Sequence, residues 1–293
     1  MTASRTVVIV GGGISGLATA FSIQERAAAA GHSIRCIVLE SAPTWGGKIV
    51  THRIGDLTTE AGPDSFLSQK QAGLELCRKL GLTDQLINTN DTAKRAFVLS
   101  RGRLHELPEG LITFVPKQLG PFLRSGLLSW TGLARMGLDV VMPRGPAQGD
   151  ESLASFFRRR FGAQAFERVL EPLMAGIYAG DAEQMSVRAT FPRFVELEQE
   201  HGSIIRGMMA AKKKQPPAPA SGLKRTMFVS LRNGLGDLVT ALTARLAQQG
   251  VELRTNCQVD ALRVRSHQPG RWMYDLILND GSALSAEALV LAT

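Results

Sequence analysis

Cysteines, long apolar runs and secretion signals are scarce in this chain, and each scarcity excludes a class of protein. Among 293 residues, the three cysteines Cys36, Cys77 and Cys257 lie far apart. They form no metal-type or redox pair, so a disulfide scaffold is excluded and a reducing cytosol is favoured. The sequence contains no charge-free stretch of about 18 apolar residues, so it predicts no membrane-spanning helix. The first residues lead straight into a strand, without the pattern of a secretory signal.

Aromatic residues are also few, with three Trp and two Tyr, although the net charge is +8. Basic residues are scattered apart from the runs Arg158–Arg160 and Lys212–Lys214. Because no basic and aromatic residues interleave as a platform, nucleic acid is not expected as a partner. The positive charge leaves an anionic substrate or an anionic membrane surface as candidates.

The remaining composition is that of an ordinary folded protein, with 44% hydrophobic and 20% charged residues. The length allows roughly two domains. Five histidines are dispersed without metal-ligand spacing. The sequence therefore predicts no metal site, and no catalytic triad is evident. We expect structural or surface roles for His105 and His201.

The first 40 residues predict a βαβ unit. Thr6 to Val10 is a short β-branched run typical of a buried strand, and a glycine-rich turn follows at Gly11 to Gly16. A helix is expected from about Ile14 to Ala30, before a second strand from Ile34 to Glu40. Such a unit predicts a parallel sheet with a right-handed crossover, and hence an α/β fold.

Beyond this unit the pattern changes from sheet to helix and back. The expected elements are short strands within 48–60, a helix at 69–80, a hairpin at 96–107 turning at Arg101-Gly102, mainly helical structure over 108–208, a helix at 237–249, and strands at 251–254, 257–265, 272–278 and 288–292. Lys212 to Gly222 is rich in proline and lysine and predicts a mobile loop. A sheet domain interrupted by a helical insertion is indicated.

The glycine turn has the pattern of a dinucleotide-binding loop, G-x-G-x-x-G. Gly11 permits the tight turn after the strand, and Gly13 lets backbone amides approach a pyrophosphate. Gly16 lets the helix pack closely on the strand. The helix N-terminus then faces the anion with unpaired N–H groups and the positive end of its dipole.

An acidic residue and two small-residue clusters favour FAD over other nucleotides. Glu40 ends the second strand, where a carboxylate accepts hydrogen bonds from a ribose diol and repels a 2′-phosphate, which argues against NADP. Gly46-Gly47 and the cluster Glu60 to Ser65 follow where an NAD dehydrogenase would continue its βαβαβ pattern.

With these segments in place, the chain resembles the flavin-containing amine oxidase superfamily and, within it, the protoporphyrinogen oxidase family. The resemblance extends along the whole chain. The segments that carry it are 7–21, 40–48, 60–67 (EAGPDSFL), 94–108, 176–181 (GIYAGD), 186–192 (SVRATFP) and 231–242.

This resemblance implies a split architecture. A Rossmann-type FAD-binding domain would consist of residues 1–89 and 225–293, with a mainly helical insertion at 90–208 and a flexible loop at 209–224. The last strand resembles one after which family members continue. We therefore expect a further C-terminal part that completes the FAD and substrate sites.

The resemblance also implies FAD contacts, residue by residue. They fall on Gly11, Gly12, Gly13, Ile14, Ser15, Gly16, Glu40, Ser41, Lys48, Gly62, Pro63, Asp64, Ser65 and, through its main chain, Val259. Two positions depart from the family pattern. Thr44 stands where many relatives have Arg, and Asn233-Gly234 stands where a second glycine pair is usual.

The implied activity is FAD-dependent oxidation of protoporphyrinogen IX to protoporphyrin IX by oxygen, with hydrogen peroxide as product, in porphyrin and haem biosynthesis. Since FAD carries out the redox chemistry, no catalytic side chain is expected. The substrate-binding residues would be Arg95, Gly176 and Ile177. The Arg95 guanidinium suits bidentate pairing with a propionate, and the other two would let a flat macrocycle lie against the protein.

Several questions stay open at this level. Residues 111–144 combine apolar runs with basic residues, so they indicate either an interfacial segment on anionic lipid or packing inside the protein. A cytoplasmic protein, with peripheral contact to the cytoplasmic face of the membrane, is expected. Alternative functions are an oxidase of amines or carotenoid-like substrates and a non-catalytic nucleotide-binding module. Coproporphyrinogen use, covalent flavin attachment and oligomeric state are not indicated either way.

Overall fold

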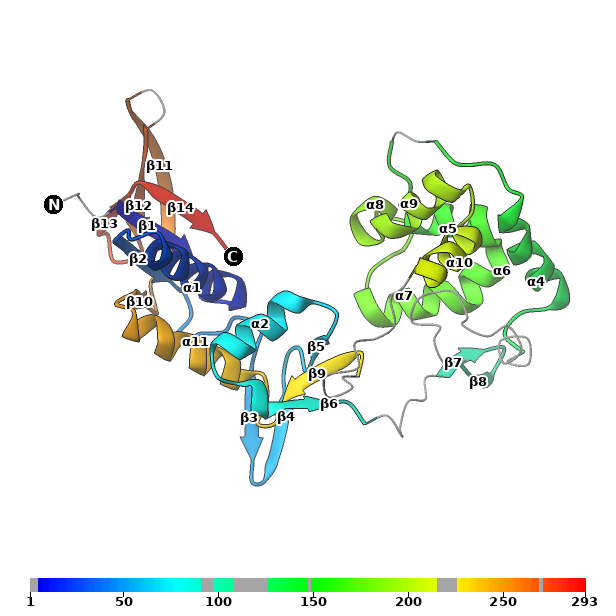
Figure 1. Cartoon of the computed structure of the whole chain (residues 1–293), viewed down its shortest axis with the longest axis horizontal. Helices are drawn as coiled ribbons and strands as arrows, with labels where there is room; N and C mark the ends of the chain where they lie inside the picture. Colours follow the sequence, from blue (N-terminus) through cyan, green and yellow to red (C-terminus); the bar gives the residue numbers. More distant parts are fainter. Residues whose placement is uncertain (1–4, 91–96, 108–125, 147–148, 215–225, 269–270) are drawn as a thin grey trace. The chain divides into compact units, whose positions relative to one another are not determined.

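The computed structural model describes residues 5–90, 97–107, 126–146, 149–214, 226–268 and 271–293 (Figure 1). The chain divides into two compact units. The first, which we call the sheet unit, comprises Met1–Asn90 and Leu223–Thr293, and the second, the helical unit, comprises Asp91–Gly222. Each unit is described by itself below.

The sheet unit is built on a parallel four-stranded sheet with the order β10-β2-β1-β14. Its strands are β1 (Arg5–Val10), β2 (Ile34–Leu39), β10 (Glu252–Arg254) and β14 (Ala288–Leu291). Helix α1 (Ile14–Ala29) connects β1 to β2, as the glycine turn predicts. The expected Rossmann-type α/β fold is confirmed. The first strand of the chain, β1, is a central strand of the sheet, with β2 on one side and β14 on the other.

Alternating side chains place a core on each face of this sheet. Ile9 of β1 and Val38 of β2 pack with α1 and with helix α11 (Gly236–Gln248), whose Leu238, Leu242 and Leu246 are buried. On the opposite face, Val8, Ile37 and Leu39 pack against an antiparallel three-stranded sheet. That sheet contains β11 (Val259–Gln268), β12 (Arg271–Leu278) and β13 (Ala283–Ala286).

Smaller elements complete the sheet unit beside α11. They are the hairpin β3 (Thr51–Ile54) and β4 (Leu57–Glu60), the antiparallel sheet of β5 (Phe66–Leu67), β9 (Phe228–Leu231) and β6 (Leu86–Asn88), helix α2 (Gln71–Lys79) and the 3₁₀ turn η1 (Thr83–Gln85). Cys77 of α2 is buried in the core that α1 and α11 share. It is a small core residue there, as expected for a cysteine on an apolar helix face.

The helical unit contains most of the described helices. They are α4 (Trp130–Gly137), the 3₁₀ turn η4 (Leu138–Val140), α5 (Leu153–Phe161), α6 (Ala163–Ala165), the π-helical turn η5 (Phe166–Leu170), α7 (Glu171–Tyr178), α8 (Val187–Thr190), α9 (Pro192–His201) and α10 (Ile204–Lys214), with a hairpin of β7 (Phe97–Ser100) and β8 (Arg103–Glu106). Their core is aromatic: the Phe157 ring contacts Phe156, Phe161 and Phe194 at centroid distances of 5.3–5.9 Å.

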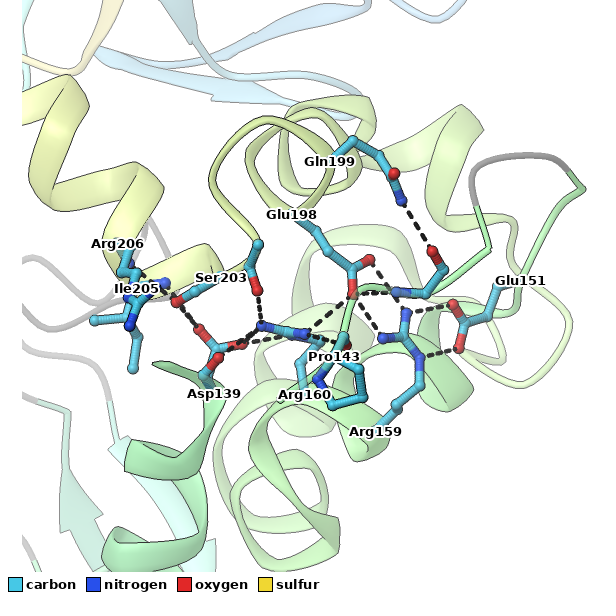
Figure 2. Close-up of polar contacts among 12 residues, drawn as sticks. Asp139, Pro143, Glu151, Arg159, Arg160, Glu198, Gln199, Ser203, Ile205 and Arg206 are labelled. Carbon is cyan, nitrogen blue, oxygen red and sulfur yellow. Dashed lines mark hydrogen bonds and ion pairs between the residues drawn. The ribbon is translucent and has the colours of Figure 1, made fainter. Parts of the chain in front are cut away.

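A buried ion network ties four elements of this unit together (Figure 2). The Arg160 side chain of α5 is fully buried and pairs with Asp139 of η4 and Glu198 of α9. It also donates to the carbonyl oxygens of Pro143 and Gly202, both at 3.0 Å. A buried guanidinium costs little only when its donors are all paired, so this network fixes how the helices meet.

Asp139 also shapes the start of α10 (Figure 2). Its Oδ2 accepts hydrogen bonds from Ser203 Oγ at 2.6 Å and from the Ile205 backbone N–H at 3.0 Å. Ser203 Oγ in turn accepts from the Arg206 N–H at 3.1 Å. The carboxylate therefore lies at the positive N-terminal end of a helix while it neutralises Arg160.

The end of one helix and the presence of one strand differ from what the sequence predicts. Helix α10 continues to Lys214, past residue 209 where a flexible loop was predicted, because its apolar residues Ile204, Ile205 and Met208 pack on the core. The sequence pattern also gave no strand at Ala283–Ala286, which pairs with β12. The predicted loop at 215–222 lies outside the described residues, as does much of the 111–144 segment. In the part of the chain that is described, no helix is both long enough and apolar enough to cross a bilayer.

Candidate functional site

The glycine turn of the sheet unit lies at the carboxyl ends of the central strands. It follows Val10, and the Gly11 N–H donates to the carbonyl oxygen of Leu39 at 2.8 Å, which joins the ends of β1 and β2. A β-carbon at Gly16 would lie 1.9 Å from the carbonyl oxygen of Gly11, so only glycine fits there. At Gly13 a β-carbon would meet nothing nearer than 3.9 Å. The turn is tight on its inner side and open beside Gly13.

Helix α1 begins within this glycine segment, at Ile14, so that Gly16 lies in its first turn. Gly13 is its N-cap residue, and no side chain among the described residues caps it. Ile14 is partly buried on the core, whereas Ser15 is exposed in the first turn of the helix. An uncapped helix N-terminus beside an open backbone turn is a site for an anion such as a pyrophosphate.

Glu40 is the first residue after β2, next to this turn. Its Oε2 accepts from the Gly12 N–H at 2.7 Å, and its Oε1 accepts from the Ala42 N–H at 2.7 Å and from Ser41 Oγ at 3.2 Å. Partial burial raises the pKa of Glu40, but these hydrogen bonds outweigh it and hold the pKa below its ordinary value. The carboxylate is thus ionised at neutral pH. Oε1 already accepts two of these bonds, whereas Oε2 accepts one and has room for a further hydrogen bond, such as one from a ribose hydroxyl.

The glycine pair Gly46-Gly47 packs directly on the turn. The Gly46 N–H donates to the Gly12 carbonyl at 2.9 Å, and a β-carbon at Gly47 would lie 3.2 Å from the Gly13 Cα. Trp45, which sequence reasoning did not select, lies against Gly12, where a β-carbon would fall 2.5 Å from the indole ring. An aromatic residue just before a glycine pair was the available signal for this contact.

The segment Gly62 to Ser65 is joined to the same region through Lys48. A β-carbon at Gly62 would lie 1.8 Å from the carbonyl oxygen of Lys48, so the two backbones touch, while the Lys48 side chain is exposed. Pro63 and Asp64 are exposed as well. The turn is held by Ser65 Oγ, which donates to Asp64 Oδ1 at 2.7 Å, and by Ser230 Oγ, which donates to the Asp64 carbonyl at 2.6 Å.

Val259 reaches the site from the far end of the sequence. The Cys257 N–H donates to the Glu40 carbonyl at 2.8 Å, and the Asn256 N–H donates to the Ala42 carbonyl at 3.1 Å. Val259 begins β11 close to these bonds and is partly buried on the neighbouring core. The cofactor residues predicted from the sequence thus all belong to the sheet unit, and these contacts link the glycine turn with Glu40, Gly46-Gly47, Lys48, Gly62 and the start of β11.

The predicted substrate residues belong to the helical unit. Gly176 and Ile177 are on α7, whose final residues are exposed: 54% for Ile177 and 43% for Tyr178. The Tyr178 ring packs edge-on against Phe191 at a centroid distance of 5.5 Å. Arg95 lies outside the described residues.

Comparisons with known proteins agree on one family. The family model for flavin containing amine oxidoreductases matches residues 14–293. A coproporphyrinogen III oxidase of Bacillus subtilis is 35% identical over 98% of this chain and 59% of its own length. A protoporphyrinogen oxidase of Bos taurus is 30% identical over the same shares of the two chains. The chain therefore spans well under two thirds of these relatives.

Solved structures give the same fold. One from Exiguobacterium sp. 255-15 is 33% identical, has a TM-score of 0.77 and is matched by 100% of this chain over 60% of its own. A putrescine oxidase with putrescine bound is 16% identical, with a TM-score of 0.63, over 99% of this chain and 58% of its own, which supports the fold alone.

The residues at the carboxyl edge of the sheet fit FAD. The open backbone at Gly13 and the uncapped N-terminus of α1 would hold the pyrophosphate, and the ionised Glu40 would hold the adenosine ribose. The chain therefore belongs to the flavin-containing amine oxidoreductase family, and its cofactor is FAD.

Proposed function

We propose that the protein oxidises a porphyrinogen to the corresponding porphyrin, with molecular oxygen as electron acceptor and hydrogen peroxide as product. The observation that carries this proposal is similarity to porphyrinogen oxidases along nearly the whole chain, together with a cofactor edge that fits FAD.

Two substrates fit this proposal. Protoporphyrinogen IX follows from the resemblance of the chain's motifs. Coproporphyrinogen III is favoured by three bacterial relatives named coproporphyrinogen III oxidase, which are 32–35% identical over 94–98% of this chain. The two porphyrinogens differ in their number of propionates, so cations positioned to pair with the additional carboxylates would favour coproporphyrinogen III.

We propose that Arg95, Gly176 and Ile177 contact the porphyrinogen. Ile177 continues the apolar stripe of Leu170, Leu173 and Met174 beyond the core of the helical unit, so its exposed side chain offers a wall for a flat ring. Gly176 beside it leaves space, since a β-carbon there would meet no described residue within 4 Å. Arg95 would pair with a propionate.

FAD supplies the chemistry of hydride acceptance and reoxidation by oxygen when it is bound. This chain's own residues would bind and orient it: the amides of the glycine turn would hold the pyrophosphate, and Glu40 would accept hydrogen bonds from the ribose. Because FAD supplies the redox chemistry, the proposed reaction requires neither a metal site nor a nucleophile–base pair from the described residues.

A steady-state comparison tests the proposed activity. The purified flavoprotein is given coproporphyrinogen III, protoporphyrinogen IX or putrescine, and porphyrin fluorescence and peroxide are followed against a no-enzyme blank. We expect both signals above the blank with at least one porphyrinogen, and none with putrescine. Peroxide with putrescine alone would replace the proposal with an amine oxidase.

The role of Arg95 has its own test. Arg95→Ala should raise the KM for the porphyrinogen about tenfold or more, because charge-assisted hydrogen bonds are worth roughly 1.5–3 kcal/mol. The rate of flavin reduction at saturation should change little. Arg101→Ala, at the exposed turn of the hairpin β7–β8, removes the same charge and serves as control. An unchanged KM in Arg95→Ala would refute the role.

We also propose peripheral membrane contact through the helical unit. Trp130, Leu138 and Val141 of the α4–η4 segment are 80%, 49% and 71% exposed, with Arg144 following. Exposed apolar residues beside cations suit an anionic lipid surface. Sedimentation with phosphatidylserine vesicles at low salt should be lost in Trp130→Ser. Equal sedimentation of both proteins would exclude this surface.

A further inference from the structure

One contact network of the sheet unit lies beside the cofactor residues without belonging to them. Thr51 and Glu60 face each other across the hairpin β3–β4, at its open end. Thr51 Oγ1 donates to Glu60 Oε2 at 2.6 Å. Both side chains reach the N-terminus of α11: Glu60 Oε1 accepts from the Leu235 N–H at 2.6 Å, and Thr51 Oγ1 accepts from the Gly236 N–H at 2.8 Å.

The turn before α11 has room for this pair only because it is built from glycine. Gly234 has a φ of 98°, and a β-carbon there would lie 2.4 Å from Thr51 Cγ2 and 2.7 Å from Glu60 Oε1. The Asn233-Gly234 sequence, at which this chain departs from the usual glycine pair, therefore lets a carboxylate close the positive end of α11. The two hydrogen bonds that the Glu60 carboxylate accepts are charge-assisted and partly buried, and are stronger than neutral ones.

Both ends of the hairpin lead to the cofactor edge. Ahead of Thr51, Gly46 packs on Val239 of α11, where a β-carbon would lie 3.2 Å from the valine side chain, and bonds to the glycine turn through Gly12. After Glu60, the Ala61 N–H donates to the Val50 carbonyl at 2.8 Å, and Gly62 touches the backbone of Lys48. The segments on either side of the hairpin are thus held relative to α11 by Glu60 and Thr51.

The two parallel helices on this face of the sheet also differ at their N-termini. Helix α1 follows β1 and α11 precedes β10, so both start at the carboxyl edge of the parallel sheet. Within the part of the chain that is described, no side chain accepts from the first N–H groups of α1, whereas Glu60 and Thr51 accept from the N–H groups of Leu235 and Gly236 at the start of α11. The unit therefore presents one open helix terminus to an anion, and fixes the other as a support.

We propose that Glu60 is a positioning residue for FAD. By closing the N-terminus of α11, it sets Gly46-Gly47 and the Gly62–Ser65 turn against the glycine turn in the geometry that FAD requires. Glu60 need not touch the cofactor. The proposal rests on FAD as the cofactor of the family and is independent of the substrate.

The test is FAD affinity of the apoprotein, measured by fluorescence titration at a temperature where each variant is folded. Glu60→Gln keeps the size of the side chain and an acceptor for Leu235, but removes the charge. We expect the Kd for FAD to rise about three- to tenfold, the range typical for residues that act through neighbouring contacts. Asp56→Asn, at the exposed turn of the same hairpin, removes the same charge and should leave the Kd unchanged.

A second variant keeps the test decisive if Glu60→Gln does not fold. Thr51→Val removes the hydroxyl that links Glu60 to Gly236 and should weaken FAD binding in the same direction. The double variant should lose little more FAD affinity than the single variant that binds FAD more weakly, because the two side chains act as one unit. A purely structural role would lower the thermal midpoint of the apoprotein without changing the Kd of the folded fraction, and would overturn the proposal. Since no porphyrinogen is present, the result is separate from the test of the activity.

Discussion

At the scale of single residues, the glycines of the turn before α1 have opposite tasks. A methyl group at Gly16 would overlap the backbone of its own turn, with 1.9 Å to the Gly11 carbonyl oxygen. Among the described residues, a methyl group at Gly13 would meet only the Gly47 Cα, at 3.9 Å. Glycine is therefore required at Gly16 by the fold, whereas at Gly13 we predict that it is required by the approaching pyrophosphate.

This difference predicts contrasting variants. Gly16→Ala should destabilise the apoprotein, since backbone must move to relieve the overlap. Gly13→Ala should leave the thermal midpoint of the apoprotein nearly unchanged and weaken FAD binding by a factor of ten or more, about 1.4 kcal/mol per tenfold change. Thermal unfolding without FAD and titration with FAD measure the two effects. Equal FAD affinity of Gly13→Ala and the parent would contradict this assignment of the turn.

Sequence alone predicted the residues of this turn because their chemistry is local. Gly11, Gly13, Gly16 and Glu40 fall within one βαβ unit, where spacing implies position. It could not predict that Glu60 meets Leu235, because these residues are 175 positions apart and no local pattern marks a carboxylate that caps a distant helix. The role of Gly234 was hidden for the same reason.

At the scale of elements, the helical unit depends on one buried arginine. Arg160 joins α5 to η4, to α9 and to the α9–α10 turn, and its carboxylate partner Asp139 has no exposed surface. Neutralising one member of a buried pair leaves the other charged and unpaired, which is more costly than losing an exposed pair.

Arg160→Met should therefore destabilise the helical unit by about 3–5 kcal/mol. Arg193→Met, which removes an exposed pair with Glu196 within α9, should cost about 0.5 kcal/mol or less. Urea unfolding followed by far-UV circular dichroism compares the two. Similar midpoints for both variants would show that the buried network contributes no stability.

The same network predicts how the helical unit responds to acid. Burial raises the pKa of Glu198, but its bonds to Arg159, Gly145 and Arg160 outweigh this and lower the pKa below the ordinary 4.5. A group whose folded-state pKa is depressed stabilises the fold above its unfolded pKa and loses that contribution as the pH falls through the folded value. The urea midpoint should thus fall below about pH 4.5. In Glu198→Gln this part of the pH dependence should be absent, and an unaltered profile would argue against it.

Long elements with a clear period were predictable, whereas short ones were not. The predicted helices at 14–30, 69–80 and 237–249 correspond to α1, α2 and α11 within two residues at each end. The four-residue strands β9 and β13 are too short to show a clear sequence pattern. They are strands because they pair with β5 and β12, which lie elsewhere in the sequence. The end of α10 was misplaced because the lysines at 212–214 resemble in composition the polar, proline-rich sequence at 215–222.

At the scale of the whole molecule, the chain spans about 59% of the length of its Bacillus subtilis relative. The residues predicted to hold FAD belong to the sheet unit, and the proposed substrate residues belong to the helical unit. Only a measurement that reports on flavin and porphyrinogen together tests the account as a whole.

That measurement is flavin reduction under strict anaerobiosis. The protein, purified with its flavin, is mixed with coproporphyrinogen III or protoporphyrinogen IX in a stopped-flow spectrometer, and the flavin absorbance is followed; oxygen is excluded because porphyrinogens oxidise spontaneously in air. The account predicts rapid bleaching with at least one porphyrinogen, reversal on admission of oxygen, and porphyrin formed in step. A flavin that stays oxidised with both porphyrinogens would contradict it.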